Sequence, residues 1–205
     1  MSKVYVVGIG PGNEKYLTLE AYRIIQQSDL LFASSRVCEA SYLEGKNVQS
    51  YDGKFGEMVA YIEEHREACQ IAILVSGDTG YYSLAHMMQK RLENIEIIPG
   101  ISAFQYLFSK IQKPWQNMEL ASVHGRDFDL VAAFEKSKGL VLLTDSEHHG
   151  GVIAQLLTEA GHGQAQMTIG ENLSYPDEKI TSGKAVDLAK EVFESLSVVV
   201  IEHEN

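Results

Sequence analysis

The sequence predicts an α/β protein with two domains, the first built on a parallel sheet and the second on a mixed sheet. In the first half, short apolar segments alternate with segments whose apolar residues have helical spacing. Continuous apolar strands that alternate with helices are typical of a parallel sheet with both faces covered. In the second half the expected strands follow one another more directly, which indicates a mixed sheet.

The boundary between the domains is expected at 113–117. Pro114 ends the preceding helical pattern, because proline cannot continue a helix interior. The surrounding segment "QKPWQNM" has the composition of a linker. We therefore predict domains at 1–113 and 114–205.

The elements of the first domain follow from hydrophobic periodicity. Thr18 is expected to cap the first helix, and the apolar run "QIAILV" is the strongest strand signal. Strands are predicted at 3–10, 29–34, 47–51, 70–78 and 95–100. Helices are predicted at 17–27, 55–68, 83–92 and 102–111.

The second domain has five further apolar runs, separated by three shorter helical patterns. Strands are predicted at 119–125, 139–145, 164–172, 178–185 and 195–203. Helices are predicted near 128–136, 148–160 and 185–194.

Composition excludes several classes of protein. The 205 residues are 45% hydrophobic and carry a net charge of −11. This charge argues against a nucleic-acid binder, which normally shows a basic stripe. No apolar run approaches the ~18 residues of a membrane span, and Cys38 and Cys69 lack metal or redox spacing. We expect a cytoplasmic protein with free thiols that binds neither nucleic acid nor membrane.

Three glycine-containing loops follow predicted strands of the first domain: "GIGPG" (8–12), "SGDTGYY" (76–82) and "PGISAF" (99–104). Ligands of parallel sheets bind at the carboxyl ends of the strands, so these loops predict one binding edge. Gly77 would let a ligand approach the backbone, and Asp78 could accept hydrogen bonds or contact a positive centre. The alternatives are that the glycines only make tight turns, and that Asp78 or Ser83 caps the next helix.

The first loop does not match the phosphate-binding patterns. Its spacing is G-x-G-x-G, and Asn13 stands where a dinucleotide-binding loop has its third glycine. No acidic residue lies about 20 positions further on at a strand end, and no G-K-[ST] follows. Nicotinamide cofactors and nucleoside triphosphates are therefore disfavoured.

These loops resemble those of the tetrapyrrole methylase family. Members carry a GxGPG loop followed by a helix similar to "LTLEAYRIIQQSD", a glycine–aspartate loop similar to Ser76–Asp78, and a loop similar to "PGIS". The resemblance covers nearly the whole chain. The stretches "GDTGYYSLA", "PGISAFQYLFSKIQKPWQN" and "SVHGR" are similar to the branch that methylates C5 in cobalamin synthesis. Thr79 departs from the proline usual in that branch.

The resemblance implies an S-adenosylmethionine-dependent C-methyltransferase that methylates C5 of a (cobalt-)precorrin in cobalamin biosynthesis. It also implies an active site in the cleft between the domains, a homodimer, and a separate C15-methylating, decarboxylating subunit as a candidate partner. The alternatives are a family methylase with a different ring-carbon or diphthine specificity, and a non-catalytic tetrapyrrole- or cofactor-binding module. The implied cofactor-binding residues are Gly10, Pro11, Ser76, Gly77, Asp78, Tyr81, Ser102, Ala103, Leu143, Asn172 and Leu173.

Methyl transfer from a sulfonium depends mostly on alignment of the reacting atoms. Asp78 and His124 are the candidate catalytic residues. A lone histidine is usually structural, but His124 lies at a predicted strand end beside Gly125 and Arg126. A substrate that bears acetate and propionate groups needs cations, and a guanidinium pairs bidentately with a carboxylate. We therefore expect Arg36 and Arg126 to bind the substrate, with Tyr82 as a flat surface.

Other polar and aromatic residues are weaker candidates. Lysines are more often solvated, and isolated aromatic residues more often belong to the core. Adjacent histidines on a helix do not face each other, so we predict no metal site. The weaker substrate candidates are Lys54, Lys110, Lys113 and Trp115, and the rejected metal group is Asp145, Glu147, His148 and His149.

Overall fold

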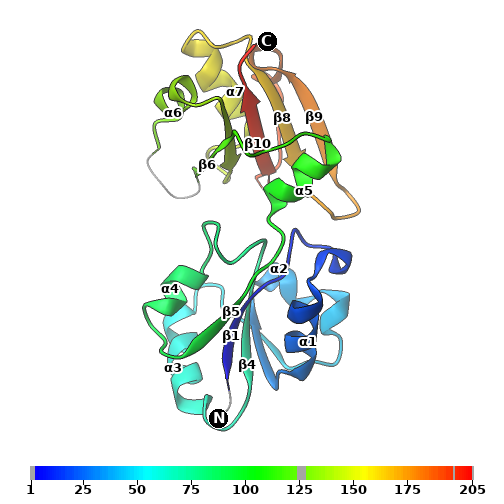
Figure 1. Ribbon diagram of the computed structural model, residues 1–205, viewed down its shortest axis with the longest axis vertical. Helices are drawn as coiled ribbons and strands as arrows, with labels where there is room; N and C mark the ends of the chain where they lie inside the picture. Colours follow the sequence, from blue (N-terminus) through cyan, green and yellow to red (C-terminus); the bar gives the residue numbers. More distant parts are fainter. Residues whose placement is uncertain (1–2, 124–127, 196, 205) are drawn as a thin grey trace. The chain divides into compact units, whose positions relative to one another are not determined.

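The computed structural model (Figure 1) describes residues 3–123, 128–195 and 197–204, and the chain divides into two compact units. The first unit is Met1–Ser102 and the second is Ala103–Asn205. The active site expected in the cleft between the domains stays a prediction.

The first unit is built on a five-stranded sheet in the order β3-β2-β4-β1-β5. All four strand pairings are parallel, which confirms the prediction. The strands are β1 (Val4–Gly8), β2 (Leu30–Ala33), β3 (Val48–Ser50), β4 (Ile71–Val75) and β5 (Ile95–Ile98).

Helices cover both faces of this sheet (Figure 1). One core joins Tyr5 and Val7 of β1 to α1 (Leu19–Gln27), and the other joins Val4 and Val6 to α3 (Phe55–His65) and α4 (Ala85–Gln89). Thr18 caps α1 as predicted, because its side chain accepts a hydrogen bond from the Ala21 N–H. Three short elements were not predicted: η1 (Glu14–Tyr16), α2 (Ser35–Cys38) and η2 (Ser41–Leu43).

The second unit contains a five-stranded sheet in the order β6-β7-β10-β8-β9. Only β6 and β7 pair in parallel among its described strands, so the sheet is mixed, as predicted. The strands are β6 (Glu119–Ser122), β7 (Gly139–Leu143), β8 (Gln166–Glu171), β9 (Lys179–Lys184) and β10 (Ser197–Glu202).

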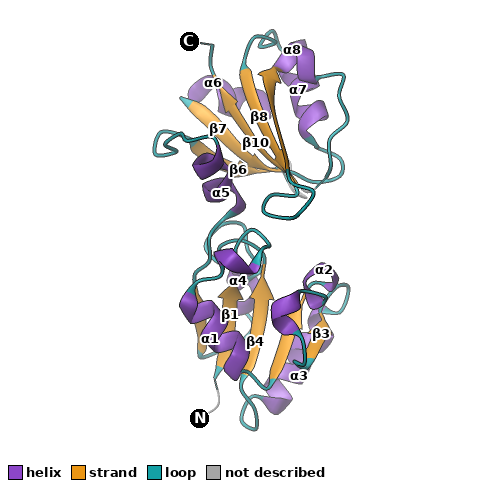
Figure 2. Cartoon of the chain, turned by 90° about the vertical axis from the view of Figure 1, so that its right-hand side faces the viewer, coloured by secondary structure: helices purple, strands orange, loops and turns teal. Residues whose placement is uncertain are grey.

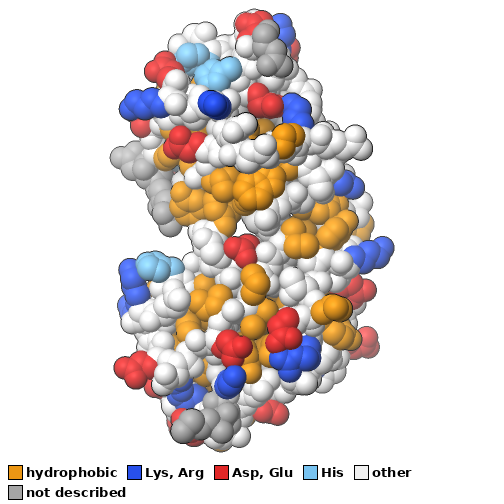
Figure 3. Space-filling model, in the orientation of Figure 1, with side chains coloured by type: hydrophobic (Ala, Val, Ile, Leu, Met, Phe, Trp, Pro, Cys, Tyr) orange, Lys and Arg blue, Asp and Glu red, His pale blue; other side chains and the backbone are white. Residues whose placement is uncertain are grey.

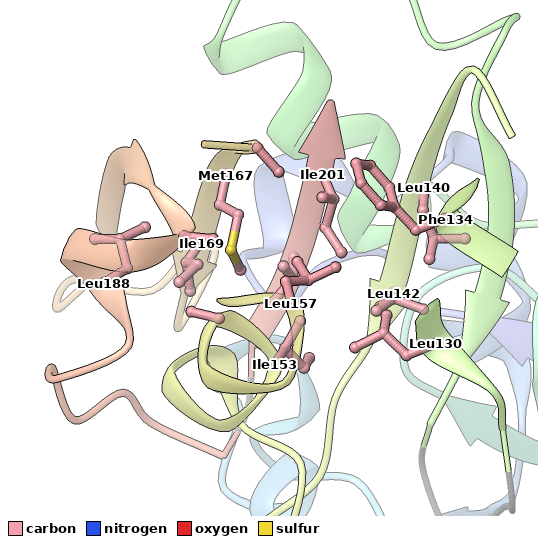
Figure 4. Packing of buried hydrophobic residues seen from close by; sticks show 14 of the residues in the cluster. Leu130, Phe134, Leu140, Leu142, Ile153, Leu157, Met167, Ile169, Leu188 and Ile201 are labelled. Atoms are coloured by element: carbon pink, nitrogen blue, oxygen red, sulfur yellow. The ribbon is translucent and has the colours of Figure 1, made fainter. Parts of the chain in front are cut away.

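The main core of this unit lies on one face of its sheet, under α6 (Leu130–Lys136), α7 (Gly150–Glu159) and α8 (Ala185–Leu188). Figure 4 shows Leu130 and Phe134 of α6 and Ile153 and Leu157 of α7 packed with strand residues such as Ile201. These side chains are at most 5% exposed.

Helix α5 (Ala103–Lys110) lies on the side of the sheet opposite α6 and α7 (Figure 2). Its Leu107 side chain packs over Gly170 of β8. This packing explains why the compact units divide before Ala103, whereas the sequence placed the boundary after α5, at the linker around Pro114.

The surface carries mixed charge. Figure 3 shows acidic and basic side chains interspersed on the visible face of each unit. Over the described residues, none of the helices has both the length and the apolar character needed to cross a membrane.

Candidate functional site

The three glycine loops meet at the carboxyl edge of the first sheet, as the parallel order β4-β1-β5 requires. Gly10, after β1, and Gly77, after β4, form two backbone hydrogen bonds. The Gly10 N–H donates to Gly77 O at 3.1 Å, and the Gly77 N–H donates to Gly10 O at 2.7 Å. The loops after β1 and β4 are thus bound to each other through the main chain.

Glycine is required where these loops touch. A Cβ on Gly100 would lie 2.3 Å from Gly77 O and 2.7 Å from the Gly8 carbonyl carbon. A Cβ on Gly8 would lie 2.6 Å from Gly100 N. Gly10 and Gly77 have φ values of +75° and +70°, which favour glycine. Close packing between loops therefore accounts for Gly8 and Gly100 without any ligand.

Asp78 joins two of the loops. Its Oδ1 accepts from the Gly80 N–H at 2.8 Å, and its Oδ2 accepts from the Gly100 N–H at 3.1 Å. Helix α4 begins only at Ala85, and Leu84 occupies its N-cap position. The alternative that Asp78 caps this helix is therefore wrong. The Ser83 hydroxyl instead accepts a hydrogen bond from the Ala85 N–H.

Other predicted residues lie along the same edge. Arg36 of α2 donates from Nη2 to the Ser76 hydroxyl at 3.3 Å. The Tyr81 and Tyr82 rings meet edge to face, with centroids 4.9 Å apart. Burial, assisted by Tyr82, raises the pKa of the Tyr81 hydroxyl far above its ordinary value. Pro11 and Ser102 are buried.

Tyr82 has an unusual backbone. Its φ is +48°, in a region that residues other than glycine rarely adopt, and the residue is 44% exposed. Left-handed backbone at a bulky residue is found mainly where the surrounding structure or a function requires it. The exposed ring is consistent with the predicted flat contact surface.

In the second unit, the predicted residues lie at one end of the sheet. Leu143 of β7 and Gly170 of β8 are both partners of Val198 on the strand between them. Asn172 and Leu173 follow directly after β8. Asn172 has a φ of +45°, and its Nδ2 donates to Asp177 Oδ2 at 2.8 Å.

Sequence reasoning missed the polar side chains that support this end of the sheet. The Thr144 hydroxyl donates to the Ser197 carbonyl at 2.8 Å and accepts from the Ser197 N–H at 3.2 Å. Glu171 is 4% exposed, and its Oε1 accepts from the Glu194 N–H at 2.9 Å. Its Oε2 lies 3.7 Å from the Lys179 ammonium. These residue types are common in any sequence, and the only available signal was their place at strand ends.

Other candidates lie outside the described residues or make contacts away from the three glycine loops. His124 and Arg126 lie outside the described residues, so their predicted roles stay predictions. Lys110 and Lys113 form ion pairs with Glu178 and Glu202, at 3.2 and 2.5 Å. Trp115 is 40% exposed and meets Phe104 edge to face.

The two histidines of the rejected metal group make other contacts. His148 bonds to Asp145 through Nδ1, and His149 caps α7 by accepting from the Gly151 N–H. In the described ranges, no three His, Cys, Asp or Glu side chains come together as metal ligands.

The first edge combines groups of opposite charge. The three loops 8–12, 76–82 and 99–103 contain one carboxylate, Asp78, and neither lysine nor arginine. One cation at this edge is Arg36, which is hydrogen-bonded to Ser76, and α5 begins at Ala103, directly after Ser102. A ligand of mixed charge fits these groups.

Comparison with known proteins identifies the family. Residues 3–189 match the model of the Tetrapyrrole (Corrin/Porphyrin) Methylases. The chain belongs to this family. It is therefore an enzyme of methyl transfer.

Two similar methylases align with this chain over most of its length and most of their own. A Methanocaldococcus jannaschii protein named as a probable cobalt-precorrin-7 C(5)-methyltransferase is 29% identical over 97% of this chain and 97% of its own. A Salmonella typhimurium cobalt-precorrin-7 C(5)-methyltransferase is 31% identical over 85% of this chain and 87% of its own.

Solved structures of methylases share the fold. The precorrin-6Y methylase of Archaeoglobus fulgidus has a TM-score of 0.76 at 22% identity and covers 99% of both chains. A uroporphyrin-III C-methyltransferase of Thermus thermophilus, solved with S-adenosylhomocysteine, has a TM-score of 0.75 at 20% identity, covering 98% of this chain and 92% of its own.

Proposed function

We propose that this methylase uses S-adenosylmethionine to methylate C5 of a cobalt-precorrin in cobalamin biosynthesis. The observation that carries the proposal is the end-to-end similarity to the M. jannaschii relative and its Salmonella counterpart, both named as cobalt-precorrin-7 C(5)-methyltransferases. The Thermus neighbour solved with S-adenosylhomocysteine supports the choice of cofactor.

The residues of the first edge fit S-adenosylmethionine. The cofactor carries a sulfonium, an ammonium and a carboxylate, and these loops offer an anionic side chain, glycine backbone and the buried Ser102. Gly10, Pro11, Ser76, Gly77, Tyr81 and Ala103 complete this set, and Leu143, Asn172 and Leu173 are the contacts from the second unit. When bound, the cofactor supplies an electrophilic methyl group.

The roles of individual residues follow from their contacts. Asp78 holds two loops through its hydrogen bonds to backbone N–H groups, so its first role is to fix the shape of the edge. Its charge also stabilises a cationic ligand. Methyl transfer is mainly a matter of alignment, so a rigid edge serves the reaction directly. His124 is the candidate for proton transfer.

The substrate side is assigned to Arg36, Tyr82 and Arg126. Arg36 is held beside the loop after β4 by its hydrogen bond to Ser76. A guanidinium in this place can pair with a carboxylate of the macrocycle. The exposed Tyr82 ring offers an apolar surface to its flat face.

The assembly is a homodimer in this proposal, and a C15-methylating subunit is its candidate partner. A Sinorhizobium relative is named a C(5,15)-methyltransferase, and the alignment covers 96% of this chain but only 48% of that protein. Light scattering at micromolar concentration should give about twice the 22.8 kDa monomer mass. A monomer mass would contradict the dimer.

The activity is tested by turnover of cobalt-precorrin-7 with S-adenosylmethionine that is ¹³C-labelled in its methyl group. Carbon NMR of the product should show one new methyl group at C5. A methyl group at another ring carbon would favour the other specificities of the family, such as that of the cobalt-factor III C(17)-methyltransferases, to which the chain is similar over 58% of its length. Absence of transfer to any tetrapyrrole would contradict the proposal.

A further inference from the structure

The Glu178 carboxylate binds groups on both sides of the turn between β8 and β9. Its Oε2 accepts from the Ser174 N–H at 2.7 Å, and its Oε1 lies 3.2 Å from the Lys110 ammonium. The Tyr106 hydroxyl donates to the same carboxylate. The Glu178 side chain is only 18% exposed, so these groups largely replace its water.

This turn has a backbone that needs support. Asn172 and Ser174 have φ values of +45° and +71°, in the left-handed region that L-residues other than glycine rarely adopt. Such conformations persist only where the surroundings impose them. The bonds Ser174–Glu178 and Asn172–Asp177 both close the turn on itself.

Glu178 also connects the turn to α5, because Tyr106 and Lys110 belong to that helix. The Leu107 and Leu173 side chains both pack over Gly170, where an added Cβ would lie 3.0 and 2.7 Å from them. The helix and the turn are therefore joined by an apolar contact and a polar one. The turn carries Asn172 and Leu173, and the helix begins with Ala103, all three proposed as cofactor contacts.

We propose that Glu178 is a positioning residue that fixes the 172–174 turn against α5 in the shape that S-adenosylmethionine requires. The inference rests on the proposed function. Glu178 itself need not touch the cofactor; it acts through Ser174, Tyr106 and Lys110. Losing the Glu178 carboxylate removes the Ser174 bond and the polar link to α5 from a strained turn, and leaves the Asn172–Asp177 bond in place. Binding then has to restore an order that the wild-type protein already has.

The test is calorimetric titration of S-adenosylhomocysteine into the folded, full-length protein at pH 7. Glu178→Gln should weaken binding roughly tenfold, the change expected when hydrogen bonds to a charged group are lost. Hydrogen exchange should accelerate at the amides of 172–178. In turnover, the KM for S-adenosylmethionine should rise while kcat stays near the wild-type value.

The matched control is Lys113→Met, which breaks the ion pair with Glu202 and leaves the turn untouched. It should bind S-adenosylhomocysteine with wild-type affinity. Tyr106→Phe removes only one donor to Glu178 and should give a smaller loss, which keeps the test open if Glu178→Gln folds poorly.

The outcomes separate this inference from the proposed function. Wild-type affinity in both Glu178→Gln and Tyr106→Phe, beside a wild-type protein that binds, would overturn the inference alone. Equal losses in Tyr106→Phe and Lys113→Met would also overturn it, because the loss of a polar contact away from Glu178, in the segment after α5, would then have the same effect. A wild-type protein that does not bind S-adenosylhomocysteine would overturn the proposed function, and the inference with it.

Discussion

The two groups of candidate residues are held together by different means. At the edge of the first sheet, the loops after β1, β4 and β5 are joined through glycine backbone, with Gly100 in contact with both Gly8 and Gly77. At the end of the second sheet, the support comes from side chains, chiefly Thr144 and Glu178. At the first edge, Gly8 and Gly100 leave no room for an added Cβ against rigid backbone, whereas the end of the second sheet depends mainly on side-chain hydrogen bonds.

The largest effect is expected from an atom added to the first edge. Gly100→Ala would place a Cβ 2.3 Å from Gly77 O, which is rigid backbone. We expect a loss of about 3 kcal/mol or more in the free energy of unfolding, because overpacking against backbone cannot relax through rotamers. Urea unfolding of wild type and variant measures this loss.

Gly56→Ala is the matched control. Gly56 lies in α3, and nothing approaches an added Cβ within 4 Å. This variant should gain up to about 1 kcal/mol in the free energy of unfolding, the difference in helix propensity between glycine and alanine. Similar stabilities of the two variants would show that the loops are not packed as described.

The end of the second sheet should lose stability when a side-chain hydroxyl is removed. Thr144→Val keeps the shape of the side chain but leaves the Ser197 N–H without its hydroxyl acceptor. We expect a loss of about 2 kcal/mol in the free energy of unfolding, since a buried donor without an acceptor bears its full desolvation cost. Thr144→Ser keeps the hydroxyl and should lose less. Urea unfolding compares the two variants. Equal unfolding free energies for Thr144→Val and Thr144→Ser would show that the hydroxyl does not support this end of the sheet.

Asp78→Asn tests the side chain that joins two loops of the first edge. An amide would turn its NH₂ group toward the N–H of either Gly80 or Gly100, where a carboxylate oxygen now accepts. The expected loss is about 1–2 kcal/mol in chemical unfolding. Unchanged stability together with lost cofactor affinity would assign Asp78 to the ligand alone.

The smallest expected effect is the loss, at acid pH, of the stability that the Glu178 carboxylate contributes. Burial alone would raise the pKa of Glu178, but hydrogen bonds from Tyr106 and the Ser174 N–H, with help from Lys110, hold it below the ordinary 4.5. A carboxyl whose pKa is lowered on folding stabilises the protein above its unfolded pKa, and this contribution is lost as the pH falls through the folded value. The unfolding free energies of wild type and Glu178→Gln should therefore converge below about pH 4.5. A difference that stays constant with pH would contradict the ionised role.

The sequence predicted the first edge better than the second. Glycine loops after apolar strands are visible as a pattern, and parallel topology alone brings Gly8, Gly77 and Gly100 to one edge. The order of the strands was not predictable, since periodicity does not say which strands pair. The role of Asp78 in joining two loops depends on that order.

The supports of the second edge could not be found in the same way. Thr144 and Ser197 are 53 positions apart, and nothing local marks either of them as part of a pair. The attachment of α5 to the second sheet rests on Leu107 and Gly170, which are also distant in the chain. Propensity and spacing report local structure, whereas these contacts are decided by tertiary packing.

The central claim is that the glycine loops of the first unit hold the methyl donor. A crystal structure of the full-length protein with S-adenosylhomocysteine tests it most directly. We predict the ligand in contact with the loops at 8–12, 76–82 and 99–103, against Gly77 and Ser102. A ligand bound away from both of these residues would contradict the account.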